Sequence, residues 1–266
     1  MLSDEVSMCL IVFAWRPSHA VPLVVAANRD EFHNRPTQPL APWDDAPELI
    51  AGRDLQAGGT WMGVTRSGRF AALTNIRVPT QPEGRRSRGE LPERYLRAEM
   101  SPQEYLAELA MQRDDYAGFN LLVGDDQSLW HLNSQEGVPL RLAEGVYGLS
   151  NASLDTPWPK LVRARTMLAG NLEALHPEAL LQLLADEQRA AEHEQPSTGV
   201  APELERLLSS AFITSSDYGT RASTALIRRS DGSFEILERS FGPEGLLGEA
   251  RFNHCPAANE RTHSNR

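Results

Sequence analysis

Cysteine is scarce in this sequence, and so is basic charge. Only two cysteines occur, Cys9 and Cys255, which is too few for a disulfide framework and lacks the paired spacing of zinc sites. Acidic residues outnumber basic ones by 36 to 26, so the net charge is −10 and the basic surface that binds a phosphate backbone is missing. We therefore expect a protein of a reducing compartment that binds no nucleic acid.

Long apolar runs and targeting signals are also missing. No apolar stretch approaches the roughly 18 residues that a membrane-spanning helix needs. The N-terminus carries Asp4 and Glu5 where a secretory signal would carry positive charge. These features predict a soluble, cytoplasmic protein without a membrane span, and they leave its oligomeric state open.

Motifs that bind nucleotides or metals are absent as well. No predicted strand is followed by a GxGxxG or P-loop pattern, so nucleotide binding by those routes is unsupported. The histidines show neither HExxH nor closely paired spacing, so we expect no metal site and no cofactor. A single histidine can still ligate a haem iron, and His19 and His33 are the candidates for haem as a ligand, although each is more commonly a surface or turn residue.

Paired apolar runs around short turns predict β-hairpins. Such runs surround the turns at Arg16–His19, Arg66–Arg69 and Gly124–Ser128. The predicted strands are Cys9–Trp15, Pro22–Asn28, Trp61–Thr65, Phe70–Asn75, Phe119–Val123, Leu129–Leu132, Gly145–Asn151, Ser223–Ile227 and Phe234–Leu237.

Stretches with helical spacing separate these hairpins. Helices are predicted within Leu91–Gln112, where Ser101 caps a second part, and over Trp158–Leu168 and Pro177–Ala191. A surface loop is predicted over Glu194–Pro202. Hairpins alternating with blocks of helix indicate an α+β layered domain rather than a doubly wound parallel sheet.

The chain is long enough for one large core. With 266 residues and 41% hydrophobic content, we expect a single domain over residues 8–252. Residues 1–7 are then an N-terminal extension. The polar residues 253–266 are expected to form a disordered tail.

The tetrapeptide Asn28-Arg29-Asp30-Glu31 follows Met8-Cys9 by one short hairpin. With it, several stretches identify the chain as a member of the NRDE-motif family, which is the Transport and Golgi organisation protein 2 family, over Met8 to about Phe241. The stretches that carry this resemblance are Gly58–Val64, Arg69–Asn75, Ser87–Gly89, Gly118–Leu122, Leu149–Asn151 and Tyr218–Arg221.

That family is similar to N-terminal-nucleophile (Ntn) hydrolases of the bile-salt hydrolase and penicillin acylase type. The resemblance implies a four-layer αββα sandwich with antiparallel sheets, and a nucleophilic cysteine whose free α-amine acts as the base. Here it implies Cys9, provided that Cys9 becomes the first residue of the mature chain. Seven residues precede Met8, and translation from Met8 followed by removal of that methionine would expose Cys9. A thiol near pKa 8.5 and an amine near 8 can exchange a proton at neutral pH.

The same resemblance assigns four further catalytic positions. Asp30 would orient the amino terminus, Asn75 would help to form the oxyanion hole, Asn151 would be a second polar group, and Arg221 would close the site. Each residue also has a purely structural interpretation. A buried strand cysteine, a salt-bridge network, turn-capping asparagines and a loop arginine paired with Asp217 would explain the same pattern.

Two residues are candidates for ligand binding. Arg29 could pair with Asp30, with Glu31 or with a substrate carboxylate. Trp61 is expected first as a core aromatic and second as a surface on which a ligand stacks.

Two functions fit this pattern. As an enzyme, the protein would hydrolyse or transfer an acyl group from a small amide or thioester through Cys9. As a non-catalytic carrier or chaperone, it would hold haem or an acyl-CoA-like ligand in the same cleft, which agrees with the haem trafficking proposed for the family. Either function requires a small-molecule partner, and a fold alone does not choose between them.

Overall fold

Two antiparallel β-sheets form the centre of the molecule. The computed structural model describes residues 8–77, 84–173 and 175–256. Sheet A has six strands in the order β10-β1-β2-β11-β12-β13. Their bounds, in that order, are Gly145–Leu149, Met8–Trp15, Leu23–Phe32, Tyr218–Arg228, Phe234–Gly242 and Gly245–His254.

Sheet B has seven strands in chain order from β3 to β9. Their bounds are Thr37–Trp43, Ala46–Asp54, Met62–Thr65, Phe70–Asn75, Phe119–Gly124, Leu129–Asn133 and Leu140–Arg141. The helices are α1 (Glu90–Arg97), α2 (Pro102–Gln112), α3 (Pro159–Gly170), α4 (Pro177–Leu183) and α5 (Pro202–Leu207), with short 3-10 turns η1 (Arg113–Asp115) and η2 (Glu192–Glu194).

Strand β1 is a continuous apolar run because both of its faces are covered. Successive side chains of a strand point to opposite faces of the sheet. Ile11, Phe13 and Trp15 lie in the core between the two sheets, whereas Leu10 and Val12 lie in the core beneath the helices. A strand that is buried on both faces has no polar side to alternate with its apolar one.

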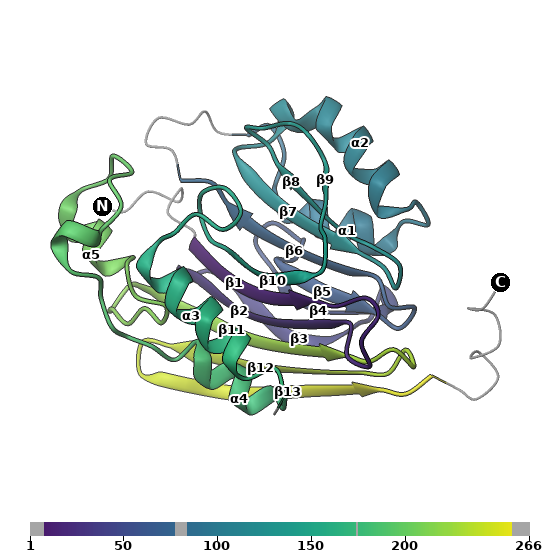
Figure 1. Ribbon diagram of the computed structural model, residues 1–266. Helices are drawn as coiled ribbons and strands as arrows, with labels where there is room; N and C mark the ends of the chain where they lie inside the picture. The colour runs from purple at the N-terminus through teal and green to yellow at the C-terminus, as the bar shows by residue number, and fades with distance from the viewer. Residues whose placement is uncertain (1–7, 78–83, 174, 257–266) are drawn as a thin grey trace.

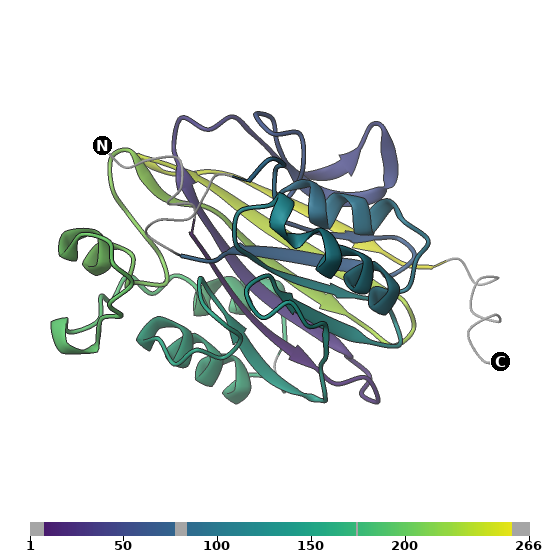
Figure 2. The same ribbon diagram turned by 90° about the horizontal axis from the view of Figure 1, so that it is seen from above.

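The apolar cores define four layers. Helices α3 and α4 pack on the outer face of sheet A through residues such as Leu161 and Leu181. Helices α1 and α2 pack on the outer face of sheet B through residues such as Tyr95 and Leu106. Figures 1 and 2 show the two helix pairs on opposite outer sides of the two sheets. This arrangement confirms the predicted α+β class and its αββα layering.

Each strand predicted from the sequence is present, with shifted ends. Strand β2 continues four residues beyond Asn28, and β11 begins at Tyr218 rather than Ser223. The predicted cap of α2 is also present. Ser101 Oγ accepts from Glu104 N at 3.3 Å, and Glu104 Oε2 accepts from Ser101 N at 3.0 Å. This reciprocal pair satisfies two backbone groups at the helix start.

Helix α4 is shorter than predicted. The prediction ran to Ala191, but the helix ends at Leu183. Asn28 Nδ2 donates to Leu184 O at 3.0 Å, and Gln188 N bonds to Asp186 Oδ1 at 2.8 Å. These bonds take up backbone groups that a continuing helix would need, so tertiary contacts overrode the helical pattern.

Four strands were not predicted: β3, β4, β9 and β13. Strand β3 contains Pro39 and Pro42, which argue against an interior strand, and it is an edge strand of sheet B. Strand β13 is the exposed edge of sheet A, so it has no buried face to reveal it. It includes Asn253 and His254, which the prediction had assigned to a disordered tail. The predicted extension at 1–7 and the tail residues 257–266 lie outside the described residues.

The sequence contains no apolar run long enough to predict a membrane-spanning helix, and the helices of the structure can be compared with that expectation. Within residues 8–77, 84–173 and 175–256, none of them combines the length and apolar character that crossing a bilayer requires.

Candidate functional site

One end of the sandwich gathers most of the residues that the sequence singled out. Cys9 lies at the start of β1, and Asn28–Glu31 lies near the end of β2. Pairing between β1 and β2 places Cys9 opposite Arg29 and Met8 opposite Asp30. The end of β6 brings Asn75 to the same place, because Asn75 O bonds to the Asn151 side chain that follows β10.

The four residues of the tetrapeptide alternate between the two faces of sheet A. The expectation that Asp30 lies just beyond its strand is wrong, because β2 continues through Phe32 and pairs there with β11. Side chains of Arg29 and Glu31 therefore face sheet B, and those of Asn28 and Asp30 face the helices. All four residues are buried.

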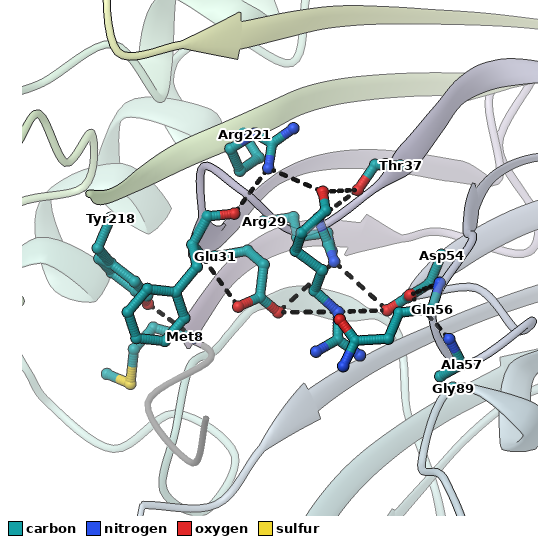
Figure 3. A network of polar contacts seen from close by, with 12 residues as sticks. Met8, Arg29, Glu31, Thr37, Asp54, Gln56, Ala57, Gly89, Tyr218 and Arg221 are labelled. Atoms are coloured by element: carbon teal, nitrogen blue, oxygen red, sulfur yellow. Dashed lines mark hydrogen bonds and ion pairs between the residues drawn. The ribbon is translucent and has the colours of Figure 1, made fainter. Parts of the chain in front are cut away.

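On the inner face, Arg29 and Glu31 belong to a chain of ion pairs, shown in Figure 3. Arg29 Nη2 lies 3.5 Å from Glu31 Oε2 and 3.6 Å from Asp54 Oδ2. Arg35 Nε continues the chain with Asp54 Oδ2 at 2.7 Å. The Arg29 guanidinium also stacks over the ring of Trp61, with its central carbon 4.6 Å from the ring centroid. Arg29 thus pairs with Glu31 and Asp54, and not with Asp30.

Trp61 is a core residue, as the first of its two interpretations expected. It is 8% exposed and lies in the core between the sheets. A methyl group added to Gly52 would lie 2.2 Å from Trp61 Cη2, so this part of β4 needs a glycine. The indole ring of Trp61 packs against the Arg29 guanidinium.

On the outer face, Asn28 joins three segments that are distant in sequence. Its amide nitrogen donates to Leu184 O at 3.0 Å and to Ala211 O at 2.8 Å. Its oxygen accepts from Ser223 Oγ at 2.6 Å. A buried amide with its bonding capacity used in this way fixes the packing of the chain around it.

Asp30 is the other outer-face residue, and only one of its carboxylate oxygens is bonded. Thr220 Oγ1 donates to Asp30 Oδ1 at 2.6 Å, while Asp30 Oδ2 is buried and receives no hydrogen bond from the described residues. Burial raises the pKa of the Asp30 carboxyl to about 6, although the nearby Lys160 ammonium pulls it down. A buried carboxylate with an unbonded oxygen is costly unless a donor satisfies it.

Lys160 is the cation that faces Asp30 from helix α3. It is 2% exposed, and its Nζ donates to Leu208 O at 2.8 Å. Burial lowers the pKa of the Lys160 amine to about 8, against the attraction of Asp30. The sequence prediction missed this residue. Lys160 shares the spacing of Ala164 and Leu168 on the buried face of α3, and that spacing was the available signal.

Cys9 lies on the inner face beside Arg29 and is 7% exposed. Burial raises the pKa of the Cys9 thiol to about 12, and the negative charge of Asp30 adds to the rise while Arg29 opposes it. With Met8 attached, the sulfur is therefore a protonated thiol at neutral pH. A reactive cysteine needs a further positive charge close to it.

Met8 occupies the position at which an amino terminus on Cys9 would lie. Its side chain is buried among Leu208, Ile213 and Tyr218. Its backbone amide donates to Tyr218 Oη at 3.0 Å. Because Met8 is paired with Asp30 and shares its face, the Met8–Cys9 peptide lies next to the Asp30 carboxyl.

The two predicted asparagines are joined to each other and to Cys9. Ser150 Oγ lies 2.9 Å from Cys9 O and 3.1 Å from Asn151 Oδ1. Asn151 Nδ2 donates to Asn75 O at 2.8 Å. The Asn151 amide thus holds the backbone of Asn75, and Ser150 links both to the cysteine strand. No sequence pattern pointed to Ser150 as a member of the site.

Arg221 does not precede its strand, as the sequence suggested. It lies within β11 at a bulge between Thr220 and Ala222. Its Nη1 donates to Phe32 O at 2.7 Å and to Arg35 O at 3.2 Å, and its Nε donates to Phe241 O at 3.1 Å. The alternative pairing with Asp217 is not formed. Arg221 therefore lies at the same end of sheet A but is held by backbone carbonyls.

The two histidines considered as haem ligands are bonded within the protein. His19 Nδ1 accepts from Val21 N at 3.0 Å in an exposed turn. His33 Nε2 lies 3.2 Å from Ser215 O, and burial lowers the pKa of its ring.

Known structures include one with the same layered arrangement. A mutant conjugated bile acid hydrolase from Clostridium perfringens superposes with a TM-score of 0.50 at 9% identity, covering 94% of this chain and 97% of that protein. At such low identity the similarity concerns the fold alone. It confirms the predicted Ntn-hydrolase type of sandwich.

Sequence comparison gives the family. The Transport and Golgi organization protein 2 homolog of Bos taurus is 35% identical over 257 residues, covering 88% of this chain and 93% of that protein. The Homo sapiens homolog is 33% identical over 262 residues, covering 90% and 95%. The family model described as Transport and Golgi organisation 2 matches residues 8–243. The chain therefore belongs to the Transport and Golgi organisation 2 family.

Proposed function

We propose that this protein is a cytoplasmic cysteine hydrolase or acyltransferase that cleaves a small amide or thioester, with Cys9 as its nucleophile. The observation that carries the proposal is the buried, unbonded Oδ2 of Asp30 beside the Met8–Cys9 peptide. Cleavage of that peptide would create an α-ammonium next to this oxygen. The Asp30 carboxylate would then hold the α-amine in place, and the α-amine would act as the base that takes the proton of the Cys9 thiol.

The amine would change the chemistry of the sulfur. With Met8 attached, burial keeps the Cys9 pKa near 12, so the thiol is unreactive. A free α-amine takes the thiol proton and becomes an ammonium, which stabilises the thiolate a few ångströms away. Activity under this proposal therefore requires removal of the residues that precede Cys9.

The reaction would proceed in two steps. In the first, the Cys9 thiolate attacks the carbonyl carbon, the α-ammonium returns its proton to the leaving amine or thiol, and an acyl-Cys9 thioester forms. In the second, water or an acceptor amine loses its proton to the α-amine and attacks the thioester, releasing Cys9. Asn75 is our candidate donor to the oxyanion of both tetrahedral intermediates, because it ends β6 and is joined to the Cys9 backbone through Asn151 and Ser150.

Mass spectrometry and acyl trapping would test the proposal. The purified protein should contain a chain that begins at Cys9. p-Nitrophenyl acetate should acetylate that residue in wild type and in the Cys255→Ser control, whose cysteine is exposed and distant in sequence, but not in Cys9→Ala. Acetylation of Cys255 alone in the wild-type chain that begins at Cys9 would show that the assignment is wrong.

A carrier function is the second candidate, and the raised pKa of the Cys9 thiol favours it for any chain that keeps Met8. Such a chain would bind haem or an acyl-CoA-like ligand without chemistry. Haem titration of wild type and His33→Ala would test one form of this proposal. An unchanged Soret band in wild type would count against haem as the ligand.

A further inference from the structure

A cavity of about 200 Å³ lies between β3 and the strands β11, β12 and β13. Its walls combine apolar residues, such as Pro39 and Leu247, with Arg221, Glu238 and Ser240. The volume is several times that of a water molecule, so the space suits a small organic molecule rather than one ion.

This cavity shares a row of residues with Cys9. Across sheet A, Cys9 pairs with Arg29, Arg29 with Ala222, Ala222 with Ser240, and Ser240 with Gly248. Paired residues of neighbouring strands point to the same face, so the thiol and the cavity are both on the inner face. Two strand spacings, about 10 Å, separate Cys9 from Ala222 at the cavity wall.

Arg221 brings a positive charge to the wall of this cavity. Its guanidinium is half-buried, and it donates hydrogen bonds to the neutral backbone carbonyls of Phe32, Arg35 and Phe241. Nη1 of Arg221 makes the bonds to Phe32 O and Arg35 O, and Figure 3 shows the other terminal nitrogen of Arg221 pointing away from the drawn network. Within the part of the chain that the structure describes, no carboxylate lies within ion-pair distance of Arg221. A partly desolvated cation of this kind favours an anion beside it.

The acidic residues of the wall are already engaged. Glu238 accepts from Leu40 N at 2.8 Å and from Thr224 Oγ1 at 3.1 Å. Glu249 pairs with Arg239 at 2.9 Å. Burial raises the pKa of the Glu238 carboxyl to about 7, which reduces its negative charge near neutral pH. The wall therefore leaves Arg221 as the group suited to a new ion pair.

We infer that this cavity binds a small organic anion, a monocarboxylate with a short apolar body, whose carboxylate pairs with Arg221. The apolar body would contact Pro39, Ala222 and Leu247. The inference does not depend on Cys9 chemistry, because it concerns binding alone. It applies equally to an enzyme and to a carrier.

Calorimetric titration of the full chain with hexanoate and with its neutral analogue hexanamide would test the inference. Hexanoate should bind saturably at one site, and hexanamide at least about tenfold more weakly, because it lacks the charge that pairs with a guanidinium. Arg221→Gln should weaken hexanoate binding by at least about tenfold. Arg229→Gln, an exposed arginine just beyond the other end of β11, is the matched control and should change it less than twofold, that is, by under about 0.4 kcal/mol.

A second variant covers the case in which Arg221→Gln does not fold. Leu247 is 68% exposed at the cavity, so Leu247→Glu adds a negative charge there without disturbing the core. It should weaken hexanoate binding severalfold. Equal affinity for hexanoate and hexanamide, or unchanged hexanoate binding in folded Leu247→Glu, would overturn the inference. Cys9→Ser should bind like wild type, which separates this result from a failure of the proposed catalysis.

Discussion

The two faces of strand β2 use the same four-residue motif in different ways. On the outer face, Asn28 and Asp30 meet backbone carbonyls, hydroxyl groups and one lysine. On the inner face, Arg29 and Glu31 meet charged partners. All four are buried, so burial does not separate their roles. The two pairs of residues differ in their neighbours. Asp30, on the outer face, is paired with Met8 and lies beside the Met8–Cys9 peptide, whereas Arg29, on the inner face, is paired with Cys9 and lies beside its thiol.

The outer residues hold neighbouring groups in fixed positions, and the inner residues balance one another's charges. The outer residues have fixed, directional partners, and one carboxylate oxygen of Asp30 is the exception. The inner residues form a chain in which Arg29 and Arg35 share Glu31 and Asp54. A change on the outer face should therefore act on a specific function, and a change on the inner face should be partly absorbed by the remaining partners.

The largest effect is expected for Asp30→Asn. The amide still accepts from Thr220 Oγ1, so the fold should persist, but it carries no charge to hold the α-ammonium of Cys9. We expect the rate of Cys9 acetylation by p-nitrophenyl acetate, in a chain that begins at Cys9, to fall by about 10²-fold or more. Stopped-flow release of nitrophenolate would measure it.

Glu31→Gln is the matched control, because Glu31 is an equally buried carboxylate on the other face. Its acetylation rate should fall less than about tenfold, because the negative charge of Glu31 raises the pKa of the Cys9 thiol, and Glu31 lies on the face opposite to Asp30. Equal losses in the two variants would remove the distinction between the faces.

Asn28→Ala should be the most destabilising change on the outer face. It removes three buried hydrogen bonds and leaves Leu184 O and Ala211 O without this donor. We expect the free energy of unfolding to fall by about 3 kcal/mol in urea titration. Asn171→Ala, which removes one exposed bond to Met167 O, should cost under about 0.5 kcal/mol. A small loss for Asn28→Ala would show that its bonds do not fix the packing.

On the inner face, Glu238→Gln should change how stability depends on pH. Burial raises the Glu238 pKa from an ordinary 4.5 to about 7. This carboxyl therefore contributes its full stability below pH 4.5 and loses it as pH rises through about 7. Between pH 5 and pH 8, wild type should lose about 2 kcal/mol relative to Glu238→Gln. Parallel stability curves for the two proteins would contradict the raised pKa.

The smallest effect is expected for Arg29→Lys. An ammonium keeps the charge but cannot stack over Trp61 and reach Glu31 and Asp54 together. Because Arg35 still pairs with both acids, we expect a loss of about 1 kcal/mol in urea titration. A loss of unfolding free energy as large as that for Asn28→Ala would mean that Arg35 does not compensate for Arg29 in pairing with Glu31 and Asp54.

The sequence was sufficient to predict the strands that are buried on both faces. Strand β1 and the first half of β2, Leu23–Ala27, are unbroken apolar runs around a short turn, so their pairing and the place of Cys9 followed. Strand β13 was missed because most of its residues are exposed, and β3 because its prolines suit an edge. Each of these two strands forms by pairing with a neighbouring strand, and the local sequence pattern carries no information about that pairing.

The candidate site was predictable in membership but not in orientation. The resemblance named Cys9, Asp30 and Asn75, and the structure brings them to one end of the sandwich. Their faces depended on β2 continuing to Phe32, a stretch whose charged residues argue locally against a strand. Lys160 contacts the site from a helix distant in sequence, so only its helical spacing pointed to it.

The bulge at Arg221 has a consequence for how this fold can vary. One additional residue in β11 places Thr220 toward the helices and Ala222 toward the other sheet, although two residues apart on a regular strand would share a side. The first residues of the strand are thereby released from the register of the rest. Tyr218 and Thr220 can thereby meet Met8 and Asp30 while the remainder of β11 keeps its packing, and the loss of a single residue at the bulge would turn the side chains of one segment to the opposite face.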